Sequence, residues 1–401
     1  MELPPGIKTK YYNGRAHVLH LLRNLYGQRQ AGKVWADFLH ESLVRIGFAQ
    51  SKIYECLFYR GSIIFIVYVC NYIFSSPSRS DIYKAIQDLR YANFEIEDQV
   101  NICNDLDFNV TKLPVGRIKL SQHLLINQII KDVKLHSHSA RVSTSAKSTR
   151  TIRRELTAPL LDRRFNYQSV IVKLNFLKNS TRADISYATH QVDRFVEYTR
   201  PPHGEAVDHL VNYLHDMRKE GLILDSKRNK SFEIFYDTDF PGNWYVPTAA
   251  DDPSTARSRS GYIVTYAGCP ITWIYRLQKM VALSSCQSKH VSFYQSLYDT
   301  TPLMGIMIEF KTKGFDVVCN NPIVRCKAFE YNSGALDLAH TPKMRPRSKH
   351  INCVHHIFSK HVRKGEISIM TISNSYQCIY MYTKTLLQNH FVKFHKCILG
   401  S

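Results

Sequence analysis

Two long tracts without any acidic residue limit how this chain can fold. The first runs from Lys134 to Arg154 and consists mainly of Ser, Thr, His, Lys and Arg, and the second runs from Pro342 to Lys364. The first tract offers too little apolar surface to offset the conformational entropy lost on folding, so we expect a basic loop or linker there. The hydrophobic cores must therefore come from the segments on either side of it.

Outside these tracts, the apolar pattern predicts a mixture of helices and strands. Trp35, Phe38, Leu39 and Leu43 recur at three- and four-residue steps, which predicts a helix that packs through this stripe and ends at Gly47. A β-hairpin is expected from strands at 57–59 and 63–74 around a Gly-Ser turn. Further helices are expected around 82–89, 125–133, 174–177, 207–214, 292–297 and 303–310, and strands around 232–236, 261–266 and 271–273.

The charge balance predicts a polyanionic partner. Lys and Arg number 53 against 33 Asp and Glu, which gives a formal net charge of +20. Nucleic acid is the partner we expect, because cations bound to phosphates release condensed counterions, and an acidic membrane surface is the competing interpretation. The longest apolar run, 62–74, is too short to span a bilayer, and no signal segment follows Met1. We therefore expect an intracellular protein, cytoplasmic or nuclear, with an undetermined oligomeric state.

The cysteines do not predict a disulfide framework or a strong zinc site. The ten cysteines are scattered, and no two have the spacing of a zinc knuckle. The densest cluster contains His350, Cys353, His355 and His356. A zinc site and a basic surface both remain open there, and the missing second knuckle favours the surface.

Several segments together carry a resemblance to a known family. Residues 25–35 read LYGQRQAGKVW, within a longer similar run at 17–58. This run resembles the palm region of Ty1/copia-type retrotransposon polyproteins, where LYGxxQAxxxW precedes the polymerase hairpin. Downstream, 174–187 is similar to the segment before the RNase H of that family, and 236–242 (YDTDFPG) to its opening strand. Shorter matches follow in family order at 257–262, 271–273, 282–285 and 342–351.

The resemblance implies an α+β fold and an order of domains. The activities implied are RNA-directed DNA polymerase and RNase H, with a template or an RNA/DNA hybrid as the nucleic-acid partner. The expected parts are a partial reverse transcriptase palm at 1–133, a basic loop or linker at 134–164, a helical thumb and connection at 165–228, and a mixed-sheet RNase H-like domain at 229–401.

The residues at the implied polymerase site argue against activity. Such chemistry uses two Mg²⁺ ions roughly 4 Å apart, held by clustered carboxylates. The Tyr-x-Asp-Asp hairpin of the family falls on residues 68–71, so Cys70 and Asn71 occupy both acidic positions. The strand that carries the third carboxylate is expected to be missing before Met1. Asp81 and Glu55 are the nearest acidic alternatives, and we expect neither at the hairpin tip.

The implied RNase H positions are also degenerate. The four acidic positions of the family fall on Asp237, Lys289, Tyr331 and Tyr380, so Asp237 is the sole surviving carboxylate. By strand alternation Asp239 lies on the same strand face as Asp237, so it does not supply a second, separate position for holding the metal ions. An ammonium group repels a divalent cation, so no cofactor is expected to bind tightly, although Mg²⁺ is the ancestral one. We therefore predict a catalytically inactive chain.

Two segments remain as candidate nucleic-acid contacts. Gln28, Arg29 and Gln30 precede the first helix, where they could hold a template phosphate or sugar. A second set, which could equally be a solvated basic face, could contact a hybrid backbone without reading sequence. This set consists of Arg345, Arg347, Lys349 and His350.

Scaffold positions depart from the family pattern as well. Val172 and Asp107 stand where the family has glycine, and such replacements predict backbone strain. Changes at catalytic and scaffold positions alike indicate a degenerate remnant. A repurposed nucleic-acid-binding protein is the alternative.

Overall fold

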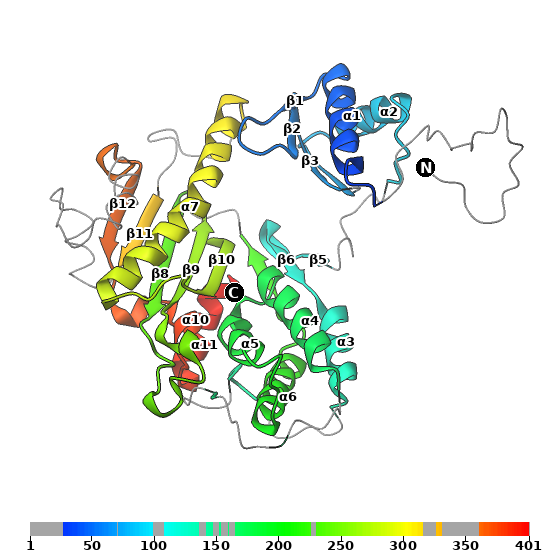
Figure 1. Cartoon of the computed structure of the whole chain (residues 1–401). Helices are drawn as coiled ribbons and strands as arrows, with labels where there is room; N and C mark the ends of the chain where they lie inside the picture. The colour runs from blue at the N-terminus through cyan, green and yellow to red at the C-terminus, as the bar shows by residue number, and fades with distance from the viewer. Residues whose placement is uncertain are drawn as a thin grey trace, which may run out of the picture. The chain divides into compact units, whose positions relative to one another are not determined.

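The chain forms two compact units, and its described residues contain three sheets (Figure 1). The units are Met1–Asp98 and Gln99–Ser401. The expected α+β character is confirmed at this level, because helices are mixed with several antiparallel pairings. The computed structural model describes residues 27–69, 71–98, 108–135, 142–146, 152–153, 159, 165–225, 230–315, 326–330 and 361–400.

The first unit is a four-stranded antiparallel sheet packed against two helices. The strand order is β1-β2-β3-β4, and alternate residues of β3 point into the core. Leu43, Phe65 and Leu89 bring the helices and the sheet together, each with at most 1% of its surface exposed. The elements are α1 (Ala31–Arg45), β1 (Ala49–Gln50), β2 (Leu57–Arg60), β3 (Ile63–Tyr68), β4 (Asn71–Ser75) and α2 (Arg79–Tyr91).

Two expectations for this unit are corrected. The strand expected over 63–74 ends at Tyr68, and β4 then returns along β3 with Tyr68 paired to Asn71. Val69 makes the turn with φ of 57°. This left-handed conformation is rare for a β-branched residue, so nothing in the residue pattern marks a turn there. The stripe of α1 is buried only in its second half, since Trp35 and Phe38 are 39% and 45% exposed.

The second unit begins with a small sheet and a helical layer. β5, β6 and β7 pair antiparallel, and the helices share one large core around Leu174, Leu210 and Tyr213. β5, β6 and α3, which the sequence assigned to the palm segment, belong to this unit by their contacts. The elements are β5 (Asn109–Lys112), β6 (Ile118–Ser121), α3 (His123–Val133), α4 (Tyr167–Ser180), α5 (Ser186–Asp193), α6 (Pro201–Asp216), β7 (Leu222–Leu224) and α11 (Gln388–Leu399).

A mixed five-stranded sheet forms the rest of the second unit. Its order is β10-β9-β8-β11-β12, with β8, β9 and β10 antiparallel and β11 and β12 parallel to β8. Helix α7 covers one face, while α10 and the helical layer lie against the other (Figure 1). The elements are β8 (Phe232–Asp239), β9 (Arg259–Tyr266), β10 (Cys269–Leu277), α7 (Ser285–Thr312), β11 (Cys326–Glu330), β12 (Ile367–Thr371) and α10 (Tyr380–Thr383).

Two further expectations are corrected in the second unit. The helices expected at 292–297 and 303–310 are one 28-residue helix, α7, which continues through Pro302. Leu297 and Met304 pack into the same core on either side of the proline. Val172 lies in α4, is 62% exposed and has no positive φ, so the expected glycine-related strain is absent. Among the described residues, no helix has the length and apolar character needed to cross a membrane.

A fully buried ion pair joins the helices of this unit. Arg182 Nε and Nη2 donate to the two carboxylate oxygens of Asp184 at 2.9 and 2.7 Å, and Tyr213 Oη donates to Asp184 at 2.6 Å. The remaining guanidinium nitrogen, Nη1, donates to the Met217 carbonyl. Burial opposes ionisation of Asp184, but Arg182 holds the pKa of this carboxyl well below its usual range. The pair is therefore ionised, and its stabilising effect fades as the pH falls below about 4.

We expect Asp184→Asn to lower the free energy of unfolding by about 3 to 5 kcal/mol at neutral pH, because it leaves the Arg182 guanidinium buried without a counter-charge. Chemical denaturation followed by circular dichroism measures this. Asp132→Asn is the matched control, since Asp132 and Lys173 form a pair that solvent still reaches, and its loss should change stability by less than about 1 kcal/mol. Equal losses in the two variants would refute the role assigned to the buried pair.

Candidate functional site

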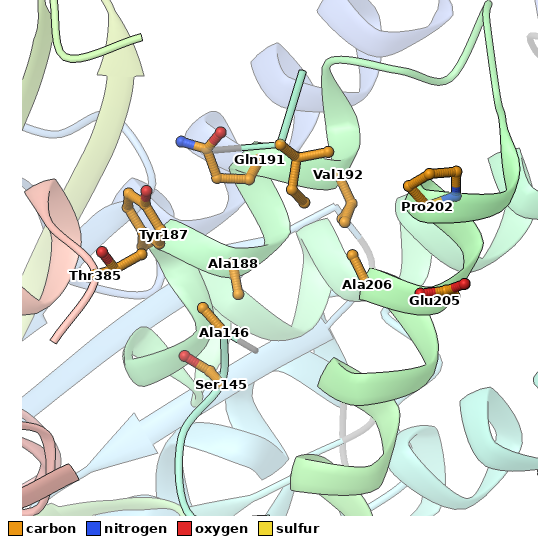
Figure 2. A pocket seen from close by; sticks show the side chains of 11 residues that line it. Ser145, Ala146, Tyr187, Ala188, Gln191, Val192, Pro202, Glu205, Ala206 and Thr385 are labelled. Carbon is orange, nitrogen blue, oxygen red and sulfur yellow. The ribbon is translucent and has the colours of Figure 1, made fainter. Parts of the chain in front are cut away.

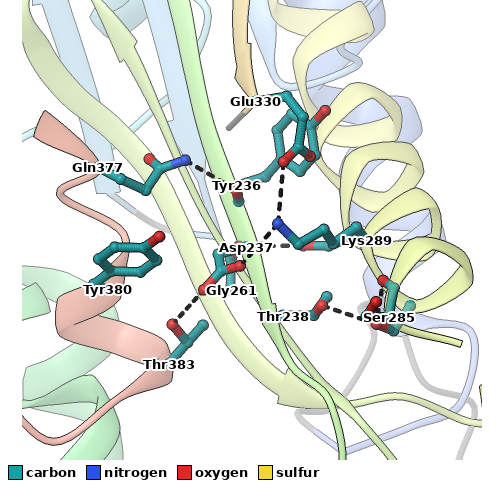
Figure 3. Close-up of polar contacts among 12 residues, drawn as sticks. Tyr236, Asp237, Thr238, Gly261, Ser285, Lys289, Glu330, Gln377, Tyr380 and Thr383 are labelled. Carbon is teal, nitrogen blue, oxygen red and sulfur yellow. Dashed lines mark hydrogen bonds and ion pairs between the residues drawn. The ribbon is translucent and has the colours of Figure 1, made fainter. Parts of the chain in front are cut away.

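Asp237 lies near the carboxyl end of β8, the middle strand of the five-stranded sheet. It is fully buried and pairs with Gly261 across β9. A Cβ atom at Gly261 would lie 2.8 Å from Thr383 Cγ2, so glycine at this position lets α10 approach the strand. Thr383 Oγ1 donates to Asp237 Oδ2 at 2.9 Å (Figure 3). The sheet and α10 together fix this carboxylate.

Lys289, from the first turns of α7, points its ammonium group at this carboxylate (Figure 3). Its Nζ atom lies 3.7 Å from Asp237 Oδ1 and donates to Glu330 Oε1 at 3.1 Å. Lys289 is only 4% exposed, and Glu330 is completely buried. The structure therefore brings together two predicted positions, Asp237 and Lys289, around one ionic cluster.

Glu330 is the member of the cluster that sequence reasoning missed. The family spacing selected Tyr331, which lies outside the described residues, and predicted a single carboxylate at the site. The structure brings a second carboxylate to it. Glu330 is the last residue of β11 and follows Cys326 and Ala328 on the face that packs against α7. This alternation was the available signal, because it makes 330 the next inward position.

The segment around α10 contributes Thr383 and Lys384. Lys384 Nζ lies 3.9 Å from Asp237 Oδ2 and 3.8 Å from the centre of the Tyr380 ring, with its side chain 47% exposed. Tyr380, the fourth predicted position, donates from its hydroxyl to Asn374 Oδ1. The polar contact that α10 makes with Asp237 thus comes from Thr383.

The cluster does not fit a pair of Mg²⁺ ions. Mg²⁺ requires hard oxygen ligands in near-octahedral geometry, and two ions require several carboxylates. Here two buried carboxylates already share one buried ammonium group, and the second ammonium, on Lys384, lies beside Asp237. Within the described ranges, no group of three or more His, Cys, Asp or Glu side chains converges as a metal site would require.

Asp239 lies two residues beyond Asp237 on β8 and is paired with Arg259 of β9. Burial raises the pKa of Asp239 to about 6, with Arg259 lowering it and Asp237 raising it. Gly242 packs directly against this side chain, since a Cβ atom there would lie 1.8 Å from Asp239 Oδ1. Asp239 therefore has a raised pKa at the end of β8, where the Gly242 backbone closes over its carboxylate.

The hairpin tip in the first unit presents no acidic residue. Tyr68 is 63% exposed and is paired with Asn71, while Cys70 lies outside the described residues. The Asp81 carboxylate accepts a hydrogen bond from the Ser62 hydroxyl. Ser62 lies at the start of β3, about 20 Å along the strand from the tip. Glu55 precedes Cys56, whose carbonyl accepts the Val67 amide, so Glu55 belongs to the chain segment beside the tip and not to the turn itself. Glu55 is exposed there as a single carboxylate.

The predicted nucleic-acid contacts are placed only in part. Gln28, Arg29 and Gln30 form the turn that leads into α1, with Gln28 and Gln30 carbonyls accepting the first helical amides. Gln30 is the N-cap, and its side chain makes no capping hydrogen bond. The other predicted set lies outside the described residues: Arg345, Arg347, Lys349 and His350.

Figure 2 shows a cavity in the second unit. It has a volume of about 140 Å³ and lies among α5, α6 and the segment 142–146. Ala188, Val192 and Ala206 give it a mostly apolar wall, with Tyr187 and Gln191 at its edge. None of the residues predicted for a site lines it.

Comparison with known proteins identifies what the chain resembles. Residues 1–146 match the family described as reverse transcriptase (RNA-dependent DNA polymerase). The chain is 26% identical to the retrovirus-related Pol polyprotein from transposon RE1 of Arabidopsis thaliana, over 98% of this chain and 26% of that protein. It is 23% identical to the corresponding polyprotein from transposon TNT 1-94 of Nicotiana tabacum, over 98% of this chain and 28% of that protein.

A shorter relative is matched over most of its own length. A transposon Ty5-1 protein of Saccharomyces cerevisiae is 24% identical over 75% of this chain and 94% of the relative. The chain spans about a quarter of the length of the plant polyproteins. The predicted resemblance to retrotransposon Pol polyproteins is confirmed over nearly the whole chain.

The free energy of unfolding should contain a component that decreases as the pH rises from about 4 to about 6, because folded Asp239 holds a proton that the unfolded chain has already released. Asp239→Asn should remove this component. Chemical denaturation at a series of pH values measures it, with the exposed Asp251→Asn as the control for a lost surface charge. Identical pH profiles for wild type and Asp239→Asn would contradict the assignment.

Proposed function

We propose that the chain is a degenerate Ty1/copia-type reverse transcriptase followed by an RNase H-like domain, and that it is catalytically inactive in both activities. Its ancestral reactions are RNA-templated DNA synthesis and hydrolysis of the RNA strand of a hybrid. Both reactions depend on two divalent metal ions that clamp the attacking and leaving oxygens. The proposal rests on the match of residues 1–146 to the reverse transcriptase family together with the residues at the two sites.

The observation that carries the proposal is the chemistry of the β3–β4 turn. Residues 68–71 are Tyr, Val, Cys and Asn, so the turn that should hold two metal ions offers no carboxylate. Glu55, on the chain segment beside the tip, is an exposed carboxylate. Each missing metal ion removes several kcal/mol of transition-state stabilisation, and about 1.4 kcal/mol corresponds to a tenfold change in rate. Polymerase activity should therefore be lower by orders of magnitude.

The RNase H-like part of the proposal is supported by the mixed sheet of the second unit. Five strands, with β8 in the middle and helices on both faces, agree with the mixed sheet flanked by helices that the resemblance implies. Asp237 lies on that middle strand. Lys289 supplies an ammonium group where the family has a metal-binding carboxylate, which argues against hydrolysis.

We expect no nucleotide incorporation by the purified chain on a primed homopolymer template with Mg²⁺ or Mn²⁺, because the hairpin turn cannot hold either ion. Incorporation above that of a heat-killed sample would refute the proposed inactivity. In that case Glu55→Gln tests one possible source, since loss of the signal would assign it to the Glu55 carboxylate. The exposed Glu41→Gln on α1 is the matched control.

Retained nucleic-acid binding is a second candidate function, favoured by the net charge of +20. We expect an RNA/DNA hybrid to bind in the presence of EDTA. The logarithm of the binding constant should fall along a straight line with the logarithm of the salt concentration. Replacing Arg345, Arg347 and Lys349 together by Gln should reduce the steepness of that line by roughly three units. Fluorescence anisotropy of a labelled hybrid measures both quantities.

The control for this measurement is the triple replacement of Lys33, Lys52 and Lys84 by Gln, which removes the same charge from exposed positions of the first unit. An equal change in the two triple variants would mean that net charge alone drives binding. Absence of binding at low salt would leave the inert remnant as the better description.

A further inference from the structure

The cluster around Lys289 holds two carboxylates and one ammonium group in the protein interior. Asp237 and Glu330 are both fully buried, and the Lys289 ammonium lies within 3.7 Å of one carboxylate and 3.1 Å of the other. Two buried carboxylates this close to one cation repel each other strongly unless that cation is present. The lysine is therefore the group that makes this pair compatible with a folded interior.

Neighbouring side chains complete the coordination of the two carboxylates. Thr383 Oγ1 donates to Asp237 Oδ2 at 2.9 Å. On the other side of the cluster, Tyr236 is buried beside Glu330, and burial first and then Glu330 raise the pKa of this tyrosine well above its ordinary value. Its hydroxyl thus stays protonated and able to donate. The cluster combines fixed donors with one central cation.

Hydrogen bonds from neighbouring side chains hold the start of α7, and with it the Lys289 ammonium group, in this position. The hydroxyl groups of Ser288 and Thr238 are 2.9 Å apart, which ties α7 to β8. Ser292 Oγ donates to the Gly261 carbonyl and ties the next turn of α7 to β9. Ser284 caps the helix by accepting from the Gln287 amide. Lys289 therefore projects from a helix held on both sides.

We propose that Lys289 is a resident cation: its ammonium group takes over the charge-neutralising role of divalent metal at the end of β8 and makes the fold of the second unit independent of metal ions. The inference deepens the proposed function and rests on it for the identity of the ion that the lysine replaces. A corollary follows for variants without the ammonium group. Asp237 and Glu330 then become a site that one divalent cation can occupy, with stability rather than catalysis as the response.

The test is thermal unfolding of the full chain, with EDTA or with about 10 mM MnCl₂. Wild type should melt at the same temperature in both conditions. Lys289→Met should melt lower by about 5 °C or more in EDTA, and Mn²⁺ should restore part of the loss. Lys384→Met is the matched control, because it removes a half-exposed ammonium 3.9 Å from the same carboxylate and should change the melting temperature little.

A double variant keeps the inference testable if Lys289→Met does not fold. Lys289→Met with Glu330→Gln removes the cation and one carboxylate together, so it should fold better than the single variant and should not respond to Mn²⁺. Stabilisation of wild type by Mn²⁺ would overturn the inference, and so would a Lys289→Met variant as stable as wild type in EDTA. Nucleotide incorporation by the wild-type chain would instead refute the proposed function and leave these melting temperatures unaffected.

Discussion

A buried carboxylate that stays ionised needs a cation or hydrogen-bond donors within reach, and this constraint governs the interior of the second unit. Water no longer stabilises the charge there, so an ion pair with good geometry and further donors must do so. The chain meets the requirement with its own side chains in two places. Arg182 neutralises Asp184 between the helices, and Lys289 neutralises Asp237 and Glu330 at the end of the central strand.

The two clusters use the same physics with different consequences. The guanidinium of Arg182 matches its carboxylate with two parallel hydrogen bonds, a planar fit that fixes helix positions. The ammonium of Lys289 is a compact point charge that lies between two carboxylates, as a metal ion would. It satisfies the electrostatic demand of the pair without providing the Lewis acidity that activates water or polarises a phosphate. A site can therefore lose its chemistry while its charge balance is preserved.

Sequence patterns predicted most helices and strands because their signals are local. The apolar runs of β8 and β9, which the structure buries, and the helical spacing in α3, α4 and α6 are visible within short stretches of sequence. The residue pattern alone continued the strand through Val69, because no glycine marks its left-handed conformation, whereas the resemblance implied a hairpin tip at residues 68–71. Glu330 was missed because family spacing, rather than the alternation of β11, was used to choose the third site position. Charge pairing across strands far apart in sequence leaves no local pattern at all.

Under the proposed function, the position of Lys289 explains how a fold of this kind persists after a change in its metal ligands. When several carboxylates converge and no divalent cation binds, their mutual repulsion destabilises the folded state. Neutral replacements reduce the repulsion but leave the remaining carboxylates buried without a partner. A lysine in place of one carboxylate removes a negative charge and adds a positive one, so a single substitution changes the local balance by two units in the stabilising direction. The buried pair of Asp237 and Glu330 is what makes that exchange favourable at this position.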